Sequence, residues 1–146
     1  MSATGRVEGK NAVVTGAAKG MGAAITLTLA REGADLLLAA RDVPPLEEVA
    51  QQARDLGRRV EVVKTDVAVD SDVAAMAAAA REFFSGKIDI LVNVAGMTGP
   101  IETPAWEIDP DDFNEVLRTN VLGTFLPIKY VIPTMISQKS GKIVNI

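Results

Sequence analysis

The sequence NAVVTGAAKGMG, residues 11–22, decides the fold. Residues 11–15 form a short apolar run, which predicts a buried β-strand. Glycines follow at 16, 20 and 22, and from Met21 to about Arg31 the apolar residues recur at helical spacing. A strand, a glycine-rich turn and a helix in this order leave free backbone N–H groups and a positive dipole end at the turn. Such a turn favours the binding of a phosphate group.

The rest of the chain repeats this alternation of strand and helix. Four more apolar runs predict strands at 36–40, 60–63, 88–92 and 142–146. Helical spacing predicts helices at 44–56, 70–83 and 110–137, and the prolines at 127 and 133 are expected to bend the last of them. This unbroken alternation indicates an α/β fold. Right-handed crossovers then give a doubly wound, Rossmann-like parallel sheet with the strand order 3-2-1-4-5, cut off at the fifth strand.

Capping residues mark the ends of the predicted helices. Gly33 and Gly57 follow the first two helices and are expected in the left-handed conformation. Asp70 or Ser71 is expected to cap the third helix, and Asp109 the fourth. Because no linker or repeat interrupts the chain, residues 1–146 are interpreted as a single domain.

Composition excludes several classes of protein and of site. The 146 residues are 48% hydrophobic and 4% aromatic, which is typical of a globular domain with an aliphatic core. The net charge is −4, so neither nucleic acid nor a membrane surface is expected as a partner. Cys and His are absent, so no metal site is expected and the usual general base is missing. Without a signal peptide or a long apolar span, the protein is expected to be soluble and cytoplasmic.

The glycine loop differs from the widespread dinucleotide fingerprint G-x-G-x-x-G, because Ala18 occupies the position of its second glycine. Taken alone, the loop is also open to interpretation as an ordinary strand-to-helix turn. Its place directly after the first buried strand favours phosphate binding, since glycine lets the backbone turn sharply and approach a ligand closely.

The loop resembles the T-G-x-x-x-G-x-G element of the short-chain dehydrogenase/reductase family, and further motifs of that family follow in order. Asp66–Val67 is similar to its Asp-Val pair, and Asn93–Val94–Ala95–Gly96 to its N-N-A-G element, with Val94 in place of the second Asn. Asn120 matches the Asn of its long helix, and Gly141–Ile146 resembles its fifth strand. Singly, Asn93 and Asp66 are also typical of turns, and Asn120 of a solvated helix face. The ordered set indicates the family from about residue 10 onward.

The resemblance implies an oxidoreductase that transfers a hydride between NAD(P) and a small alcohol or carbonyl substrate. It implies that the chain is the family's nucleotide-binding domain, incomplete at its C-terminus, and that the full-length protein is a homo-oligomer. Asn120 is assigned to catalysis, because the family's Asn helps to hold a water in a proton relay. The residues expected to bind the cofactor are Gly16, Lys19, Gly20, Met21, Gly22, Arg41, Asp66, Val67, Asn93, Ala95 and Gly96.

Arg41 decides which cofactor is expected. An acid near the end of the second strand binds the ribose of NAD, whereas an Arg there suits the 2′-phosphate of NADP. NAD-preferring family members have Asp at the position of Ala40, and Arg41 follows it. Lys19 adds a second cation in the glycine loop. NADP is therefore expected, with NAD as the alternative, since a shift of one residue would place Asp42 on the ribose.

The family's catalytic Ser, Tyr and Lys are expected beyond Ile146. The single Tyr of the chain, Tyr130, is followed four residues later by Thr134 and not by Lys, and it precedes the fifth strand. It is therefore interpreted as a packing residue. We expect the chain to be the N-terminal part of a longer enzyme and to be inactive by itself. A truncated gene product without catalysis and a non-catalytic nucleotide-binding or interaction module are the alternatives.

Overall fold

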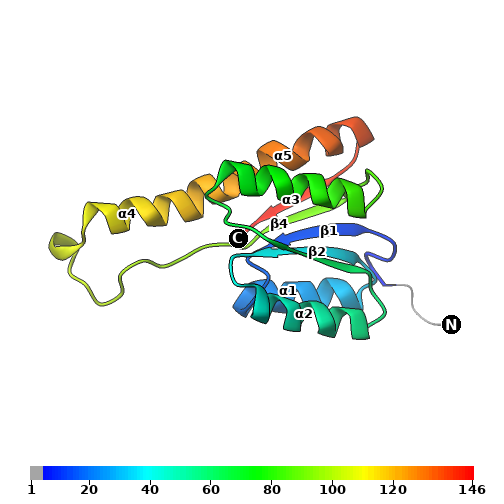
Figure 1. Cartoon of the computed structure of the whole chain (residues 1–146), viewed down its shortest axis with the longest axis horizontal. Coiled ribbons are helices and arrows are strands. Elements are labelled where there is room, and N and C mark those ends of the chain that lie inside the picture. The colour runs from blue at the N-terminus through cyan, green and yellow to red at the C-terminus, as the bar shows by residue number, and fades with distance from the viewer. Residues whose placement is uncertain (1–4) are drawn as a thin grey trace.

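The computed structural model describes residues 5–146, in which strands and helices alternate along the chain (Figure 1). The elements are β1 (Asn11–Thr15), α1 (Gly20–Arg31), β2 (Asp35–Ala40), α2 (Val43–Asp55), β3 (Val60–Lys64), α3 (Asp70–Phe83), β4 (Ile90–Asn93), the 3-10 turn η1 (Ala105–Glu107), α4 (Pro110–Leu117), the π-helical segment η2 (Arg118–Leu122), α5 (Gly123–Gln138) and β5 (Lys142–Asn145). Within residues 5–146, no helix is both long enough and apolar enough to cross a bilayer.

The five strands form one parallel sheet in the order β3-β2-β1-β4-β5, which confirms the predicted fold. β1 lies in the middle, where Val13 is paired with Leu37 of β2 and with Leu91 of β4. Helices α1 and α2 cover one face, and α3 and α5 cover the other (Figure 1). The order of the strands reverses beside β1: the chain proceeds from β1 to β2 and β3 on one side, and then crosses to β4 and β5 on the other. Open α/β sheets bind ligands at this point, outside the carboxyl ends of the strands.

The core has two halves, one on each side of the sheet, and β2 contributes to both. Leu36 and Leu38 pack on the side of α2 with Leu46, whereas Leu37 packs on the side of α3 with Met76. All five side chains are fully buried. Successive residues of a strand point to opposite faces, so a strand covered on both faces must be apolar throughout. This accounts for the uninterrupted apolar runs in the sequence.

The fourth strand begins later than predicted, at Ile90 and not at Ile88. The side chain of Gln138 binds both backbone groups of Ile88: its Oε1 accepts from the N–H at 2.9 Å and its Nε2 donates to the carbonyl at 2.8 Å. The carboxylate of Asp89 accepts from the backbone N–H of Asn11 at 3.0 Å. Side chains therefore satisfy the groups that strand pairing would otherwise satisfy.

The long helix predicted from Pro110 is divided by the π-helical segment η2. Bends were predicted at Pro127 and Pro133, but both lie inside α5, which continues through them, and the interruption comes earlier. The hydroxyl of Thr124 donates to the carbonyl of Asn120 at 2.8 Å, so part of the altered backbone bonding is satisfied by a side chain. Nothing in the hydrophobic spacing of the sequence signals a π segment.

Most predicted caps are confirmed. Gly33 and Gly57 have φ values of +99° and +82°, and the side chain of Asp109 accepts from the N–H of Asp111 at 2.8 Å. The predicted cap of α3 is wrong, because Val69 is the N-cap residue and Asp70 already lies in the helix. The side chain that reaches back from this first turn belongs to Asp72, which contacts the loop before the helix.

Candidate cofactor-binding site

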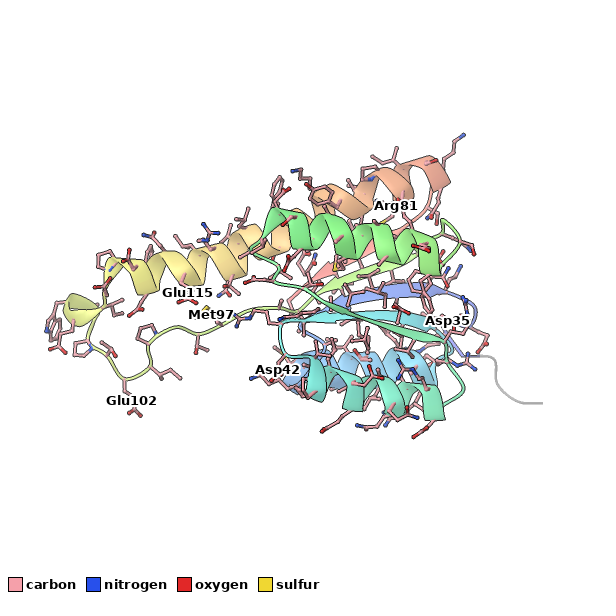
Figure 2. All side chains as sticks on the ribbon, in the orientation of Figure 1. Asp35, Asp42, Arg81, Met97, Glu102 and Glu115 are labelled. Atoms are coloured by element: carbon pink, nitrogen blue, oxygen red, sulfur yellow. The ribbon has the colours of Figure 1, made fainter. Side chains whose placement is uncertain are left out.

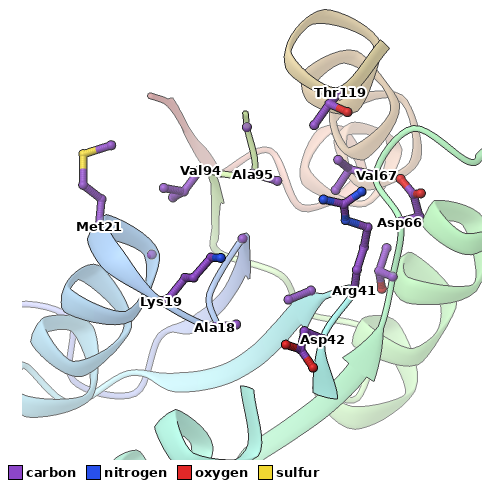
Figure 3. Close-up of a pocket in the computed structure, with 15 residues that line it drawn as sticks. Ala18, Lys19, Met21, Arg41, Asp42, Asp66, Val67, Val94, Ala95 and Thr119 are labelled. Carbon is purple, nitrogen blue, oxygen red and sulfur yellow. The ribbon is translucent and has the colours of Figure 1, made fainter. Parts of the chain in front are cut away.

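A cavity of about 250 Å³ lies over the carboxyl ends of the strands, beside β1, where the strand order reverses (Figure 3). The β1–α1 loop, the end of β2, the β3–α3 loop and the segment after β4 form its walls. It is lined by Gly16, Ala18, Lys19, Met21, Gly22, Ala40, Arg41, Asp42, Thr65, Asp66, Val67, Val94, Ala95, Gly96 and Thr119. All residues predicted to bind the cofactor are in this set, except Gly20 and Asn93.

Two glycines of the β1–α1 loop are required by close backbone packing. Gly16 has φ +63°, and a Cβ on it would lie 2.6 Å from the backbone nitrogen of Ala95. A Cβ on Gly22 would overlap the carbonyl oxygen of Gly16. Gly20 has φ +56° but faces open space, so it is required by its backbone conformation and not by its neighbours. The loop therefore lies close to the start of α1 and to the end of β4.

The start of α1 offers hydrogen-bond donors to the cavity. Lys19 occupies the N-cap position and makes no capping hydrogen bond, so among residues 5–146 the start of α1 has no side-chain cap. The first backbone N–H groups of a helix have no partner within the helix, and the positive dipole end lies there. This end of α1 is therefore suited to an anionic group such as a pyrophosphate.

Two cations enter the cavity from different walls. Lys19 reaches in from the start of α1 and Arg41 from the end of β2, whereas the carboxylate of Asp42 points away from the Arg41 guanidinium (Figure 3). Within residues 5–146, neither Lys19 nor Arg41 forms an ion pair or a side-chain hydrogen bond. Their donors remain available to a ligand with several anionic oxygens.

Thr15 joins the two loops that flank the cavity, and its sequence position alone did not indicate this. Its buried hydroxyl oxygen accepts from the backbone N–H of Val94 at 3.2 Å and from that of Ala95 at 3.3 Å. Thr15 ends β1, and the register pairs it with Asn93 at the end of β4. The sequence feature that could have indicated this role is a polar residue at the end of an otherwise apolar strand.

Two predicted residues, Asn93 and Asn120, do not line the cavity. Asn93 is 2% exposed, and its amide nitrogen donates to the side-chain oxygen of Asn145 at 2.9 Å, which links the ends of β4 and β5. Asn120, assigned to catalysis by the resemblance, lies in η2. Its amide forms two hydrogen bonds of 2.8 Å with the backbone N–H and carbonyl of Met97. Met97 belongs to the extended segment that follows β4 (Figure 2).

Several lining residues were not predicted to bind the cofactor. Thr65 lies in the loop after β3 and Thr119 in η2, and the apolar Ala18 and Val94 line the cavity as well. The hydroxyl of Thr65 donates to the carbonyl of Val63 at 3.2 Å. Thr65 directly follows β3, so its place at the strand end could have indicated it. Thr119 reaches the cavity only because η2 lies beside the β3–α3 loop, and a long-range contact of this kind leaves no local sequence pattern.

Tyr130 lies away from the cavity, which agrees with its interpretation as a packing residue. Its hydroxyl donates to the carboxylate of Asp70 at 2.6 Å, and the ammonium of Lys129 lies 3.0 Å from the same carboxylate. The hydrogen bond from Tyr130 and the contact with Lys129 together hold the pKa of Asp70 below its usual value. This cluster joins α3 to α5 on the outer surface.

The comparison with known families matches residues 10–146 to the family described as short chain dehydrogenase. The chain belongs to the short-chain dehydrogenase/reductase family. An uncharacterized oxidoreductase of Staphylococcus saprophyticus is 38% identical over 141 residues, which cover 96% of this chain and 59% of the relative. A second one, from Staphylococcus aureus, is 38% identical over 138 residues, which cover 94% of this chain and 57% of the relative.

Solved structures of the short-chain dehydrogenase/reductase family superpose closely. An NAD+-bound xylitol dehydrogenase gives a TM-score of 0.91 at 36% identity, covering 96% of this chain and 53% of that one. A metagenomic short-chain oxidoreductase in complex with NADP gives 0.88 at 34% identity, covering 95% and 62%. The chain thus spans less than two thirds of the length of these relatives. Its relatives include both NAD-bound and NADP-bound proteins.

Proposed function

We propose that the full-length protein is an NADP-linked oxidoreductase that oxidises an alcohol or reduces a ketone by hydride transfer. In this proposal residues 1–146 form its nucleotide-binding domain, of which residues 1–4 lie outside the described structure. The observation that supports this proposal most is the cavity beside β1, where the strand order reverses. The uncapped start of α1 forms one wall, and the unpaired side chains of Lys19 and Arg41 extend into the cavity. The pyrophosphate would lie at the start of α1, and the adenosine half over β2 and β3.

NADP is favoured over NAD by the chemistry at the end of β2. Ala40 lines the cavity where a carboxylate would be needed to bind both ribose hydroxyls, and Arg41 follows it with its guanidinium inside the cavity. A planar guanidinium can bind a phosphate through two parallel hydrogen bonds and can stack on an adenine ring. When NADP is bound, its nicotinamide supplies the hydride chemistry, and this chain supplies position and charge.

Asn120 is proposed to position the site and not to transfer a proton itself. Both polar atoms of its amide are bound to Met97, so it holds the segment after β4 against η2. A group that exchanges a proton must lie within hydrogen-bond reach of the reacting atom. On the nicotinamide side, the lining residues Val94, Ala95 and Gly96 offer no side-chain acid or base. The acid and base of the reaction are therefore proposed to lie outside residues 5–146.

Substitution of Arg41 tests the proposal. In the full-length protein we expect NADPH to bind more tightly than NADH, and Arg41→Ala to remove most of this preference. Loss of a charge-assisted contact with the 2′-phosphate should cost about 1.5–3 kcal/mol, while the affinity for NADH changes little. Titration of both cofactors by fluorescence or calorimetry measures the four affinities.

Arg31→Ala is the matched control, because Arg31 is an exposed cation at the far end of α1. It should leave both affinities unchanged, apart from a small effect of net charge. Equal affinities of the wild-type protein for NADPH and NADH would contradict the proposed preference. Tighter binding of NADH, weakened by Asp42→Ala, would instead place Asp42 on the ribose.

We further propose that the substrate is a small alcohol or carbonyl compound, and that the full-length protein self-associates. A row of exposed apolar side chains along α4, η2 and α5 supports self-association: Phe113, Leu117, Val121 and Phe125. These side chains are 43–61% exposed and recur every four residues, so they form one face suited to packing against another helix.

A further inference from the structure

Asp72 is not among the residues that line the cavity, but its side chain binds the backbone of the loop that forms one wall. It lies in the first turn of α3, and its Oδ2 accepts a hydrogen bond of 2.9 Å from the backbone N–H of Asp66. Asp66 and Val67 line the cavity. We propose that Asp72 is a positioning residue for the adenosine half of the cofactor, acting through the backbone of Asp66. This inference rests on the proposed nucleotide site.

The β3–α3 loop has few anchors of its own. The Asp66 carboxylate accepts from the N–H of Ala68 at 2.9 Å, and the carbonyl of Asp66 accepts from the N–H of Val69 at 3.0 Å, so both contacts lie within the loop. The guanidinium of Arg118 approaches the carbonyl of Ala68 at 3.5 Å, which is long for a hydrogen bond. Thr65, which precedes Asp66, is held to β2 by a hydrogen bond of 2.9 Å from its N–H to the carbonyl of Ala40. The bond from Asp72 is the short polar contact that joins Asp66 itself to α3.

The position of this loop relative to the cavity determines which half of the cofactor it affects. With the pyrophosphate at the start of α1, β2 and β3 lie on the adenosine side and β4 on the nicotinamide side. Loosening of Asp66 and Val67 should thus weaken adenosine binding and leave the nicotinamide side unchanged. A carboxylate acceptor makes a charge-assisted hydrogen bond, which is stronger than a neutral one.

The test is carried out on the full-length protein with ADP, 2′,5′-ADP and NADPH as probes. We expect Asp72→Ala to weaken the binding of all three by about tenfold, the scale of one charge-assisted hydrogen bond. Asp72→Ser, whose shorter side chain does not reach Asp66, should behave in the same way. Asp72→Asn keeps an acceptor oxygen but makes a neutral hydrogen bond, so it should lose only about threefold, clearly less than Asp72→Ala.

Asp70→Ala is the matched control, since it removes an acid from the same helical turn. Asp70 contacts Lys129 and Tyr130 on α5 and not the cavity, so this variant should bind all three nucleotides like the wild type. General damage to the site would weaken NADPH more than 2′,5′-ADP, whereas a positioning role on the adenosine side weakens both by the same factor.

The outcomes separate the two proposals. Unchanged affinities in Asp72→Ala and Asp72→Ser, an equal loss in Asp72→Asn, or an equal loss in Asp70→Ala would overturn the role of Asp72. If wild-type protein binds ADP more tightly than 2′,5′-ADP, the NADP preference is wrong, and the role of Asp72 is still decided by the ratio between its variants. If no adenine nucleotide binds to the wild type, both proposals fail.

Discussion

Replacement of Gly22 by valine is expected to lower the affinity of the full-length protein for NADPH by about 100-fold or more, the effect of losing two or more phosphate hydrogen bonds. A Cβ at this position would overlap the carbonyl oxygen of Gly16. The β1–α1 loop must therefore move away from the start of α1. The backbone N–H groups proposed to bind the pyrophosphate would then no longer converge on one point.

Ala24→Val is the control for this variant. Ala24 lies on the exposed side of α1. The Ala24→Val variant therefore introduces the same β-branched residue into the same helix without contacting the loop. It should retain wild-type affinity and lose only a little thermal stability. Thermal melting followed by circular dichroism shows that both variants are folded at the temperature of the titration. Wild-type affinity in Gly22→Val would mean that the loop is an ordinary turn.

Expressed by itself, the 146-residue chain is expected to aggregate or to unfold partly. Strand β5 forms an exposed edge of the sheet, where Val144 and the adjoining Ile146 are 45% and 63% exposed. The apolar row along α4, η2 and α5 is exposed as well. Half-exposure of these six large side chains forgoes about 5–10 kcal/mol of burial, which is comparable to the net stability of a typical domain at about 5–15 kcal/mol. Open edges also pair with other chains.

Size-exclusion chromatography and thermal melting of the 146-residue chain measure this expectation. Val144→Lys together with Phe125→Ser should reduce aggregation, because a charge on the edge strand and a smaller apolar face both oppose association. The chain should show no turnover with NADPH and a carbonyl compound. A monomeric chain with a cooperative transition would contradict the stability claim. Turnover would show that an acid and a base lie within the 146 residues.

The fold could be predicted from the sequence because its signals are local and repeated. The first three apolar runs are each followed by a turn residue and a helical pattern, and right-handed crossovers then restrict the order of the strands in the sheet. The errors lie where a side chain binds a backbone group that the local rules assign to strand pairing or to the helix cap. Gln138 binds the backbone of Ile88 and delays β4, and Asp72, not a residue at the helix cap, reaches back from α3.

The candidate site was predicted only in part, for a related reason. Residues at strand ends, such as Gly16, Arg41 and Asp66, could be placed because parallel strands bring their carboxyl ends to one edge. Thr119 was missed because it reaches the cavity from η2, which no sequence pattern predicts. Asn93 matches a family motif, but the strand register directs it to Asn145 and away from the cavity. Motifs thus locate a site more reliably than they assign each residue to it.

A crystal structure of the full-length protein with NADP+ tests the central claim most directly. We predict that the pyrophosphate lies against the backbone N–H groups at the start of α1, and that the 2′-phosphate lies within hydrogen-bond distance of Arg41, about 2.7–3.2 Å. The adenosine half should contact the loop that contains Asp66 and Val67. A nucleotide bound elsewhere, or bound here with its 2′-phosphate directed away from Arg41, would contradict the account.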